Sequence, residues 1–406
     1  MSFKLEIEGD QHLESIKVLF LTHNYIRFKG DFAGVFLHLL ARQLREEGVE
    51  VVVVAPHDAT LPDSETIEGI NIHRFRYGKD EEETFAYRGE MHRQLFRNPF
   101  RIFLLIRFLK SAYHLACSVI EKENLSVVSV HWVIPNGVVA HFLKKRYKDK
   151  IKLILSSHGT DIRLLCEMPL IHRFFRPIIK QAKAWTVVSS YLKSKITKLG
   201  KEAADKVTVV PLPNDETLFY PDPQVHKEPM LVVAVSRLTG QKRISFLLEA
   251  IKAISKELPE ARLEIYGTGP EKLSLARRID ELGLKGRAII KEPVPQQELR
   301  KVYNRAAVVV LNSIEEGFGL ALTEAMLCRT AVIGTNSGGI TDIIEDKQTG
   351  LLVPPDDIEK LADAIGMILK DRHLRARLAE AGYRKALAQF SSRSSARKFA
   401  ELFRKK

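Results

Sequence analysis

The sequence predicts an α/β protein made of two doubly wound domains, each a mainly parallel sheet covered by helices on both faces. Short apolar runs alternate with helical patterns along almost the whole chain, which is typical of β-α-β units. One proline-rich stretch interrupts this alternation near the middle. A length of 406 residues suits two or three domains, and 45% hydrophobic with 28% charged residues excludes a disordered, fibrous or mainly membrane-spanning chain.

The first series of elements begins with an apolar run at residues 17–22, which predicts a buried strand. Apolar residues then recur at helical spacing over 35–47, Gly48 ends that helix, and 51–54 predicts a second strand. Further strands are predicted at 127–130, 152–155 and 184–188. We expect these elements to form a first domain over residues 1–212.

The second series follows residues 211–229, which contain five prolines and predict a linker. Strands are predicted after it at 231–236, 262–266, 288–290, 308–311 and 331–333, and residues 358–404 are predicted to be helical almost throughout. We expect this second domain to span residues 213–387. Ligands of such sheets bind beyond the carboxyl ends of the strands, so the loops that follow strands are the places to search for a site.

The positive charge is concentrated in one part of the chain. Lys plus Arg number 63 and Asp plus Glu 50, a balance of +13, and residues 101–200 alone hold 18 basic and 5 acidic residues, which also gives +13. A local anionic partner is therefore expected rather than a generally basic protein. Because no nucleic-acid-binding module is recognisable, we expect no nucleic acid partner.

Residues 91–120 contain basic residues and no acid, interleaved with aromatic and aliphatic side chains. One interpretation is a helix that lies against an anionic membrane surface with its aromatic side chains inserted. The other is a buried helix with a few basic surface residues, or a helix at an acceptor site. The sequence leaves both open, and no window reaches the ~18 uninterrupted apolar residues of a spanning helix.

Three cysteines at wide spacing, Cys117, Cys166 and Cys328, indicate reduced thiols rather than a disulfide framework or a zinc site. The first ten residues lack the basic-then-apolar pattern of a secretory signal. We therefore expect a cytoplasmic protein, with peripheral attachment to the inner face of the membrane if residues 91–120 touch lipid.

The loop at residues 312–320 is the strongest candidate for chemistry. It follows a predicted strand and leads into a helix predicted at 320–327, whose first-turn N–H groups can bind an anion, and Gly317 and Gly319 allow close approach to the backbone. Glu316 and Glu324 would accept hydrogen bonds from sugar hydroxyls in such a site. Alternatively, they are solvated or serve as helix-start charges.

Two further loops carry polar residues after predicted strands. Arg237 and Lys242, five residues apart, flank a turn and could hold one diphosphate, although in isolation the segment favours a solvated basic loop. His158 lies in the 156–161 loop as a candidate site residue, or as a structural histidine beside a helix cap from Thr160 or Asp161. No Asp-x-Asp pair and no His/Cys cluster with ligand spacing occurs, so no metal site is predicted.

Taken together, these loops resemble glycosyltransferase family 4, the retaining glycosyl transferases of group 1. The segment from Glu316 to Glu324 is similar to the E-x₇-E element of that family, and Arg237 with Lys242 is similar to its R-x₄-K element. Residues 157–161 resemble its H-G-x-D loop, and 336–340 with 349–355 resemble its glycine loop and the strand that follows. The resemblance covers about residues 16–390 in family order.

The resemblance implies a GT-B fold, in which two Rossmann-like domains face a central cleft and a C-terminal helix, about 388–406 here, crosses onto the first domain. It implies a nucleotide-diphospho-sugar donor, either a UDP- or a GDP-sugar, and a saccharide, lipid-linked or other glycoconjugate acceptor. No cofactor or metal is required: Arg237, Lys242 and helix N–H groups would neutralise the diphosphate. A hexose-type sugar would be transferred with retention of anomeric configuration.

The resemblance also assigns roles to single residues. Glu316 and His158 would contact the transferred sugar near the reacting centre, and Glu324 would accept the ribose hydroxyls. The donor-binding set would further comprise Gly317, Phe318, Gly319 and Leu320 through their N–H groups, Val294 near the base, and Gly34 near the phosphate. Ala33 replaces the first glycine of the Gly-Gly pair usual at that point, and Asp342 replaces a usual Glu.

Two other functions stay open at this stage. One is another GT-B enzyme, such as a sucrose- or trehalose-type synthase that joins two small sugars. The other is a non-catalytic nucleotide-sugar-binding partner in a larger assembly, which the presence of Glu316, Glu324, Arg237 and Lys242 together disfavours.

Overall fold

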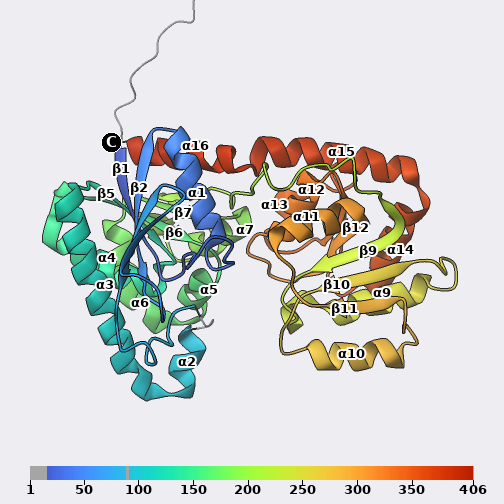
Figure 1. Cartoon of the computed structure of the whole chain (residues 1–406), viewed down its shortest axis with the longest axis horizontal. Helices are drawn as coiled ribbons and strands as arrows, with labels where there is room; N and C mark the ends of the chain where they lie inside the picture. Colours follow the sequence, from blue (N-terminus) through green and yellow to red (C-terminus); the bar gives the residue numbers. More distant parts are fainter. Residues whose placement is uncertain (1–15, 88–90, 406) are drawn as a thin grey trace, which may run out of the picture.

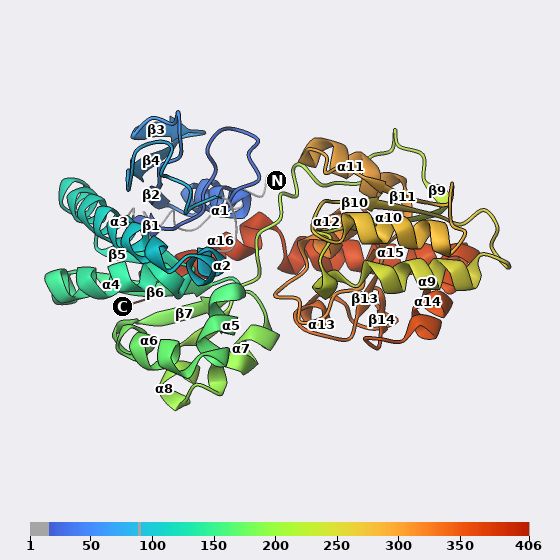
Figure 2. The same cartoon turned by 90° about the horizontal axis from the view of Figure 1, so that it is seen from below.

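The protein contains two separate sheets, each flanked by helices, and the two lobes lie side by side along the long axis of the molecule (Figures 1 and 2). The structure is a computed structural model and describes residues 16–87 and 91–405. The predicted class, α/β with two doubly wound domains, is confirmed. The predicted domain limits at residues 212 and 387 stay a prediction.

The first sheet has eight strands in the order β3-β4-β2-β1-β5-β6-β7-β8, all parallel except for the antiparallel β3–β4 pair. Its central strand β1 pairs on both edges, with Val18 opposite Val51 on one side and Val127 on the other. The strands are β1 (Ile16–Leu21), β2 (Val49–Pro56), β3 (Ser64–Ile67), β4 (Ile70–Phe75), β5 (Val127–His131), β6 (Lys152–Ser157), β7 (Ala184–Val187) and β8 (Val207–Val209).

All five strands predicted for this domain are present, whereas the β3–β4 hairpin and β8 were not predicted. The strand β3 is short and its side chains are half-buried or exposed, so it lacks the apolar run that marks a buried strand. Its hairpin turns at Glu68 and Gly69, which both have positive φ, as tight hairpin turns require. The hairpin therefore depends on backbone geometry that an apolar pattern does not report.

Helices cover both faces of the first sheet (Figure 2). The helical segments are α1 (Val35–Glu46), α2 (Met91–Arg97), η1 (Pro99–Arg101), α3 (Ile102–Glu123), α4 (Val133–Tyr147), η2 (Lys148–Lys150), α5 (Thr160–Glu167), α6 (Pro169–Gln181), α7 (Ser190–Thr197) and α8 (Lys201–Ala204).

The α3 helix divides into two unlike halves. Among the described residues, Pro99–Glu123 is the one helix long and apolar enough to cross a membrane by length and composition alone. Its second half, however, packs into the first domain's core through Phe108, Ala112 and Ala116, all fully buried. Its first half, together with the preceding η1, leaves apolar side chains in solvent, with Phe100 of η1 80% and Phe103 of α3 66% exposed. The helix is thus an integral part of the domain with an apolar exposed end.

The second sheet is entirely parallel, in the order β11-β10-β9-β12-β13-β14. The strands are β9 (Glu228–Val235), β10 (Arg262–Tyr266), β11 (Ala288–Lys291), β12 (Ala306–Leu311), β13 (Ala331–Thr335) and β14 (Leu351–Val353). The helical segments are η3 (Gly240–Lys242), α9 (Ile244–Ile254), α10 (Lys272–Glu281), α11 (Gln296–Arg305), α12 (Leu320–Leu327), α13 (Ile340–Ile343) and α14 (Ile358–Lys370). The predicted strands are confirmed, and the helix predicted at 320–327 has those bounds.

The chain between the two sheets, residues 210–227, contains no helix or strand. The predicted linker is slightly too long, because Pro229 is the second residue of β9. A proline is tolerated there because it lies at the start of the strand, where the β9–β12 register is irregular.

The C-terminal region crosses from the second domain to the first. The predicted continuous helix is divided into α14, α15 (Arg372–Gln389) and α16 (Ser392–Arg404), and α15 and α16 run along the top of both lobes (Figure 1). Phe399 and Phe403 of α16 are buried in one core cluster with Phe20 of β1 and apolar residues of α1. Lys152 of β6 also donates from its ammonium to the backbone oxygen of Lys405, at 2.7 Å.

Phe403→Ala is expected to destabilise the first domain by about 3–5 kcal/mol, because it removes a buried aromatic ring from that core. Both tryptophans, Trp132 and Trp185, lie in the first domain. Urea unfolding followed by tryptophan fluorescence therefore measures this domain. Arg393→Ala, an exposed change on the same helix, serves as the control. Equal unfolding midpoints for Phe403→Ala and the wild type would show that α16 does not stabilise the first domain.

Candidate active site

The main candidate site is a cavity of about 530 Å³ between the two domains. The loops that line it follow β6 and open α5 and α7 in the first domain, and follow β9 and β12 in the second. These are the carboxyl ends of parallel strands, where ligands of doubly wound sheets bind. Among the predicted site residues, the structure brings together here His158, Arg237, Lys242, Glu316 and the 317–320 segment.

The loop that carries Arg237 is held in place by the loop after β10. The Ser236 N–H donates to the Tyr266 carbonyl at 3.1 Å, and the Leu238 N–H donates to the Thr268 carbonyl at 2.9 Å. A Cβ at Gly267 would lie 1.9 Å from the carbonyl oxygen of Ser236, so only glycine fits. The Gly-x-Gly pair at 267–269 thus supports the neighbouring loop, a structural role that requires no bound dinucleotide.

The loop that carries Glu316 is supported in the same way by the glycine loop after β13. The Gly339 N–H donates to the Glu316 carbonyl at 2.7 Å. Gly338 has φ +64° and a Cβ there would lie 2.6 Å from both the nitrogen and the oxygen of Glu316. On its other side the Ile314 N–H donates to the Gln241 carbonyl at 3.0 Å, which ties this loop to the segment that carries Lys242.

The second-domain wall carries four charged side chains: the paired Lys242 and Glu316, the exposed Arg237, and Glu315, which pairs with Lys195 of the first domain. The Lys242 ammonium forms an ion pair with the Glu316 carboxylate, and both side chains are largely shielded from solvent. Arg237 lines the same cavity and is exposed, and its guanidinium has no ion-pair or hydrogen-bond partner among residues 16–87 and 91–405. The wall can therefore receive a further anion at Arg237.

The start of α12 supplies backbone donors to the same cavity. Gly319, with φ +119°, turns the chain into the helix, and residues 317–320 line the cavity. The Phe318 side chain is buried and packs against Phe390, with ring centroids 5.7 Å apart. We therefore expect a ligand to contact this position through the backbone.

Glu324 faces a second cavity, of about 380 Å³, that Gln296 and Gln297 also line from the second domain and Gly30 and Asp31 from the first. Leu320 lines both cavities. The hydroxyl of Tyr303, which the sequence analysis did not single out, donates to the Glu324 carboxylate at 2.8 Å. Burial raises the pKa of Glu324 to about 7, despite that hydrogen bond.

Two residues predicted for the donor site lie outside the lining of both cavities. Val294 is partly buried and packs against the main core. Gly34 is buried, and a Cβ there would lie 2.5 Å from the carbonyl oxygen of Asn24, so internal packing already requires glycine. Their predicted roles near the base and the phosphate stay predictions.

His158 stands on the first-domain wall of the main cavity. Its Nε2 lies 3.3 Å from Nδ1 of His131, and its ring contacts that of Trp132, with centroids 4.5 Å apart. Its own Nδ1 is buried without a hydrogen-bond partner in the described part of the chain. Burial, together with neighbouring His131 and His23, holds the pKa of His158 well below its usual value, so the ring is neutral near pH 7.

Asp161 positions this histidine rather than facing the cavity. Its buried carboxylate accepts hydrogen bonds from the N–H groups of Val133 at 3.0 Å, His158 at 3.3 Å and Gly159 at 3.2 Å. These bonds join the loop after β5 to the loop after β6. The polar loop at 156–161 therefore combines the two interpretations of the sequence, because His158 lines the cavity and Asp161 is structural.

Polar contacts cross the cavity between the domains. The Ser190 N–H at the start of α7 donates to the Asp342 carboxylate at 2.6 Å. The Glu315 carboxylate accepts from the Tyr191 hydroxyl at 3.2 Å and pairs with Lys195 at 3.4 Å. Sequence reasoning missed these pairs, because partners more than a hundred residues apart meet only once the domains are placed.

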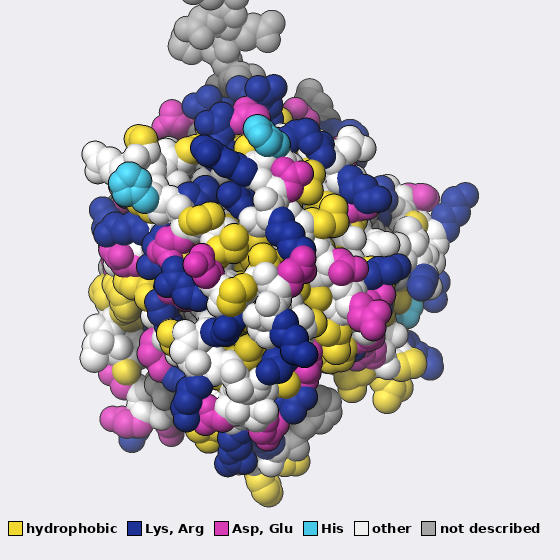
Figure 3. Space-filling model, turned by 90° about the vertical axis from the view of Figure 1, so that its right-hand side faces the viewer, with side chains coloured by type: hydrophobic (Ala, Val, Ile, Leu, Met, Phe, Trp, Pro, Cys, Tyr) yellow, Lys and Arg dark blue, Asp and Glu magenta, His cyan; other side chains and the backbone are white. Residues whose placement is uncertain are grey.

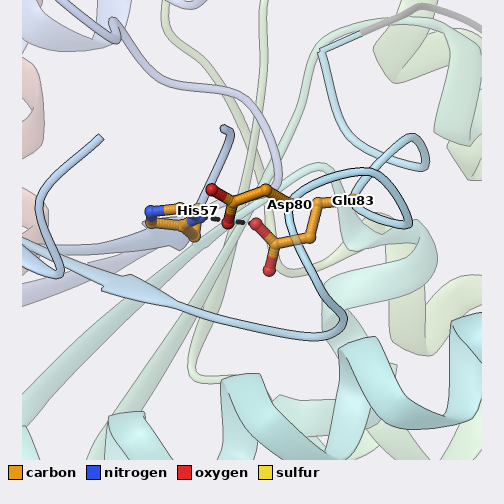
Figure 4. A group of neighbouring side chains, drawn as sticks. All are labelled: His57, Asp80 and Glu83. Carbon is orange, nitrogen blue, oxygen red and sulfur yellow. Dashed lines mark hydrogen bonds and ion pairs between the residues drawn. The ribbon is translucent and has the colours of Figure 1, made fainter. Parts of the chain in front are cut away.

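One group of potential metal ligands occurs among the described residues, in the first domain: His57, Asp80 and Glu83 (Figure 4). Their binding atoms are already engaged. His57 contacts Glu83 through Nδ1 and the Leu61 carbonyl through Nε2, while Asp80 pairs with Arg76 at 2.7 Å. This arrangement fits a buried hydrogen-bonded His57–Glu83 pair better than a metal centre, and the prediction of no metal site stays a prediction.

Comparison with known proteins agrees with the geometry. The family described as Glycosyltransferase Family 4 matches residues 33–217, and Glycosyl transferases group 1 matches residues 218–385. The chain is 30% identical over 281 residues to N-acetyl-alpha-D-glucosaminyl L-malate synthase of Bacillus anthracis, covering 68% of this chain and 73% of that protein. It is 27% identical to a GDP-mannose-dependent phosphatidylinositol monomannoside mannosyltransferase of Mycolicibacterium smegmatis, covering 62% and 69%.

Solved structures share the fold. Sucrose-phosphate synthase from Thermosynechococcus elongatus superimposes with a TM-score of 0.78 at 22% identity, covering 96% of this chain and 98% of that one. Anabaena HepE in complex with UDP and glucose superimposes with a TM-score of 0.68 at 17% identity, covering 95% and 99%. The GT-B fold is thereby confirmed.

The raised pKa of Glu324 predicts a pH-dependent stability. Because a pKa of about 7 lies above the ordinary glutamate pKa of 4.5, the folded protein binds the Glu324 proton more tightly than the unfolded chain does. Stability should therefore fall by up to about 3 kcal/mol as the pH rises from about 4.5 to about 7. Glu324→Gln should remove this dependence, measured by urea unfolding with circular dichroism at pH 5 and pH 8. Glu359→Gln, an exposed change, should retain it. An unchanged pH dependence in Glu324→Gln would contradict the assignment.

Proposed function

The chain belongs to glycosyltransferase family 4, the group 1 glycosyl transferases, and on this basis we propose that it is a retaining, metal-independent hexosyltransferase. The donor would be a nucleotide-diphospho-sugar, a UDP- or a GDP-sugar. The acceptor would be a saccharide, a lipid-linked molecule or another glycoconjugate. One observation carries this proposal: Arg237, Lys242 and Glu316 line the same interdomain cavity that His158 lines from the other domain.

The donor's diphosphate would lie against Arg237, Lys242 and the first N–H groups of α12. The Arg237 guanidinium lacks a partner among the described residues, and a diphosphate would supply one. It would also compete with Glu316 for the Lys242 ammonium and free the Glu316 carboxylate for the sugar hydroxyls. The ribose would extend past Leu320 toward Glu324, since Leu320 lines both cavities.

Transfer with retention would proceed on one face of the sugar. The bond from the anomeric carbon to the phosphate oxygen breaks while the bond to the acceptor oxygen forms. The acceptor's proton passes to the departing phosphate oxygen. The two cations and the helix N–H groups hold the charge of the leaving diphosphate in place of a metal ion. His158, neutral and on the first-domain wall, would contact the transferred sugar; because its Nδ1 is shielded in the unliganded structure, a hydrogen bond from this atom to a sugar hydroxyl would require the ring to turn.

A synthase that joins two small sugars is the second candidate, and the exposed end of α3 favours a glycoconjugate acceptor over it. Phe100, Ile102, Phe103 and Ile106 are each at least 44% exposed there, beside Arg97, Arg107 and Lys110. Aromatic and basic side chains together suit an anionic lipid surface. We propose that this end of α3 contacts the inner face of the cytoplasmic membrane, where a lipid-linked acceptor would lie.

Lys242→Ala and Glu316→Ala are each expected to lower sugar transfer by roughly a hundredfold or more without loss of folding. Release of UDP or GDP from a panel of nucleotide-sugars measures transfer, and circular dichroism measures folding. Lys347→Ala, an exposed change in the same domain, is the control and should leave turnover unchanged. Excess EDTA should have no effect on the wild type. Near-normal turnover in either active-site variant would refute the assignment.

Anionic liposomes are expected to sediment the wild-type protein at low salt and to release it at high salt, because screening weakens attraction between exposed charges. Phe100→Ser/Phe103→Ser should lower the bound fraction at low salt, whereas Leu273→Ser, an equally exposed apolar residue on α10, should not. Absence of wild-type binding at low salt would exclude the membrane contact and leave the transferase assignment intact.

A further inference from the structure

A second large groove, of about 790 Å³, lies on the side of the second domain that faces away from the interdomain cavity. It is bounded by the amino ends of β9, β12 and β13 and by one face of α15. Figure 3 shows the molecule from that side, and Lys and Arg side chains are numerous over its upper part, at the level of α15. The residues that line the groove are Lys227, Pro229, Ala307, Arg329, Ala331, Arg372, Arg375, Ala376, Ala379, Glu380 and Arg384.

The charge of this lining is strongly one-sided, with five cations and a single carboxylate. That carboxylate, Glu380, already interacts with two of the cations. It forms an ion pair with Arg329 and accepts a hydrogen bond from Nε of Arg384 at 2.8 Å. The other three, Lys227, Arg372 and Arg375, have no acidic partner among the described residues. The lining therefore holds an excess of positive charge, although Asp371, at the start of α15 and outside the lining, favours the charged form of Arg375.

Two of these three cations are held in place by hydrogen bonds to backbone carbonyls, and in the case of Lys227 also to a hydroxyl. The Lys227 ammonium donates to the Ala306 carbonyl at 2.8 Å and to the Thr330 hydroxyl at 3.0 Å. The Arg375 guanidinium donates to the Ile368 and Leu369 carbonyls at 2.8 and 3.2 Å, at the end of α14. A ligand would thus meet cations that are already ordered, so little entropy is lost on binding.

Burial and neighbouring positive charge together lower the pKa values of two of these cations. Although Lys227 as a whole is exposed, its ammonium is shielded beside Ala306 and Thr330, and this burial, with a smaller contribution from Arg375, lowers its pKa to about 8. Burial and then neighbouring Arg372 also lower the pKa of Arg375. Arg372 itself is exposed and has no partner in the described structure, so its guanidinium is free to move onto a ligand. A bound anion would relieve this repulsion.

We propose that this groove is a second ligand site, which binds a small polyphosphate or multiply phosphorylated metabolite. Guanidinium groups bind phosphate oxygens in pairs, and the volume is that of a small-molecule site. It is distinct from the donor cavity, because the eight residues of β9 separate them by roughly 26 Å. The occupant would contact α15, whose continuation α16 packs on the first domain, and so would touch the element that joins the two lobes.

Titration calorimetry with sodium pyrophosphate tests this site on the full chain. Arg372→Glu is the chosen variant, because Arg372 makes no described contact that the change would break. We expect it to weaken pyrophosphate binding at the groove by about tenfold or more, through loss of one positive charge and gain of a negative one. Arg377→Glu changes the same helix by the same charge outside the groove and should bind as the wild type does. Equal affinity of Arg372→Glu and the wild type would overturn the proposal.

A second variant and a second measurement distinguish binding in this groove from binding in the donor cavity. In Lys242→Ala, any pyrophosphate binding at the donor cavity is weakened, while the groove stays intact. Complete loss of pyrophosphate binding in this variant would therefore also overturn the proposal. Amine acetylation read by mass spectrometry gives a measurement on unaltered protein. Pyrophosphate should protect Lys227 at least severalfold, and unprotected Lys227 would overturn the proposal even if Arg372→Glu fails to fold. Failure of the transferase assignment would leave both readouts unchanged.

Discussion

The candidate site depends on direct backbone contact between neighbouring loops at one end of the second sheet. Glycines at 267 and 338 let the loops after β10 and β13 approach the backbones of the loops that carry Arg237 and Glu316, at distances where a Cβ would overlap. These candidate side chains are therefore positioned by main-chain hydrogen bonds from flanking loops, and not only by their own packing. Since parallel strands bring all these loops to the same edge, the sheet order is what makes such support available.

The buried parallel strands were predictable because their signal is strong and local. The strand β12, for example, is buried at every residue and appears in the sequence as an uninterrupted apolar run. The β3–β4 hairpin was not predictable in this way, since its outer strand buries little and its turn depends on backbone conformation at Glu68 and Gly69. The division between α14 and α15 was also not predicted, because Asp371 caps α15 within a sequence whose helical pattern is continuous.

The candidate site was predictable as a set of loops but not as an arrangement. Spacing alone placed Arg237, Lys242 and Glu316 after strands, and the structure brings them to one cavity. Spacing could not show that Glu324 opens onto a separate cavity with Tyr303 as its partner, or that the environment keeps His158 neutral. Such properties depend on distant segments and on burial, neither of which a local motif contains.

The ion pair between Lys242 and Glu316 has a consequence for which molecules the unliganded site admits. To bind at Lys242, a simple anion such as phosphate would have to displace the Glu316 carboxylate from the Lys242 ammonium. The carboxylate would then be shielded from solvent without a new partner, which is costly for a charged group. A nucleotide-sugar would compensate both halves at once, with its diphosphate on the lysine and its hydroxyls on the glutamate. At Lys242 the pair would thus favour a nucleotide-sugar over a simple anion, whereas Arg237 on the same wall stays open to an anion of either kind.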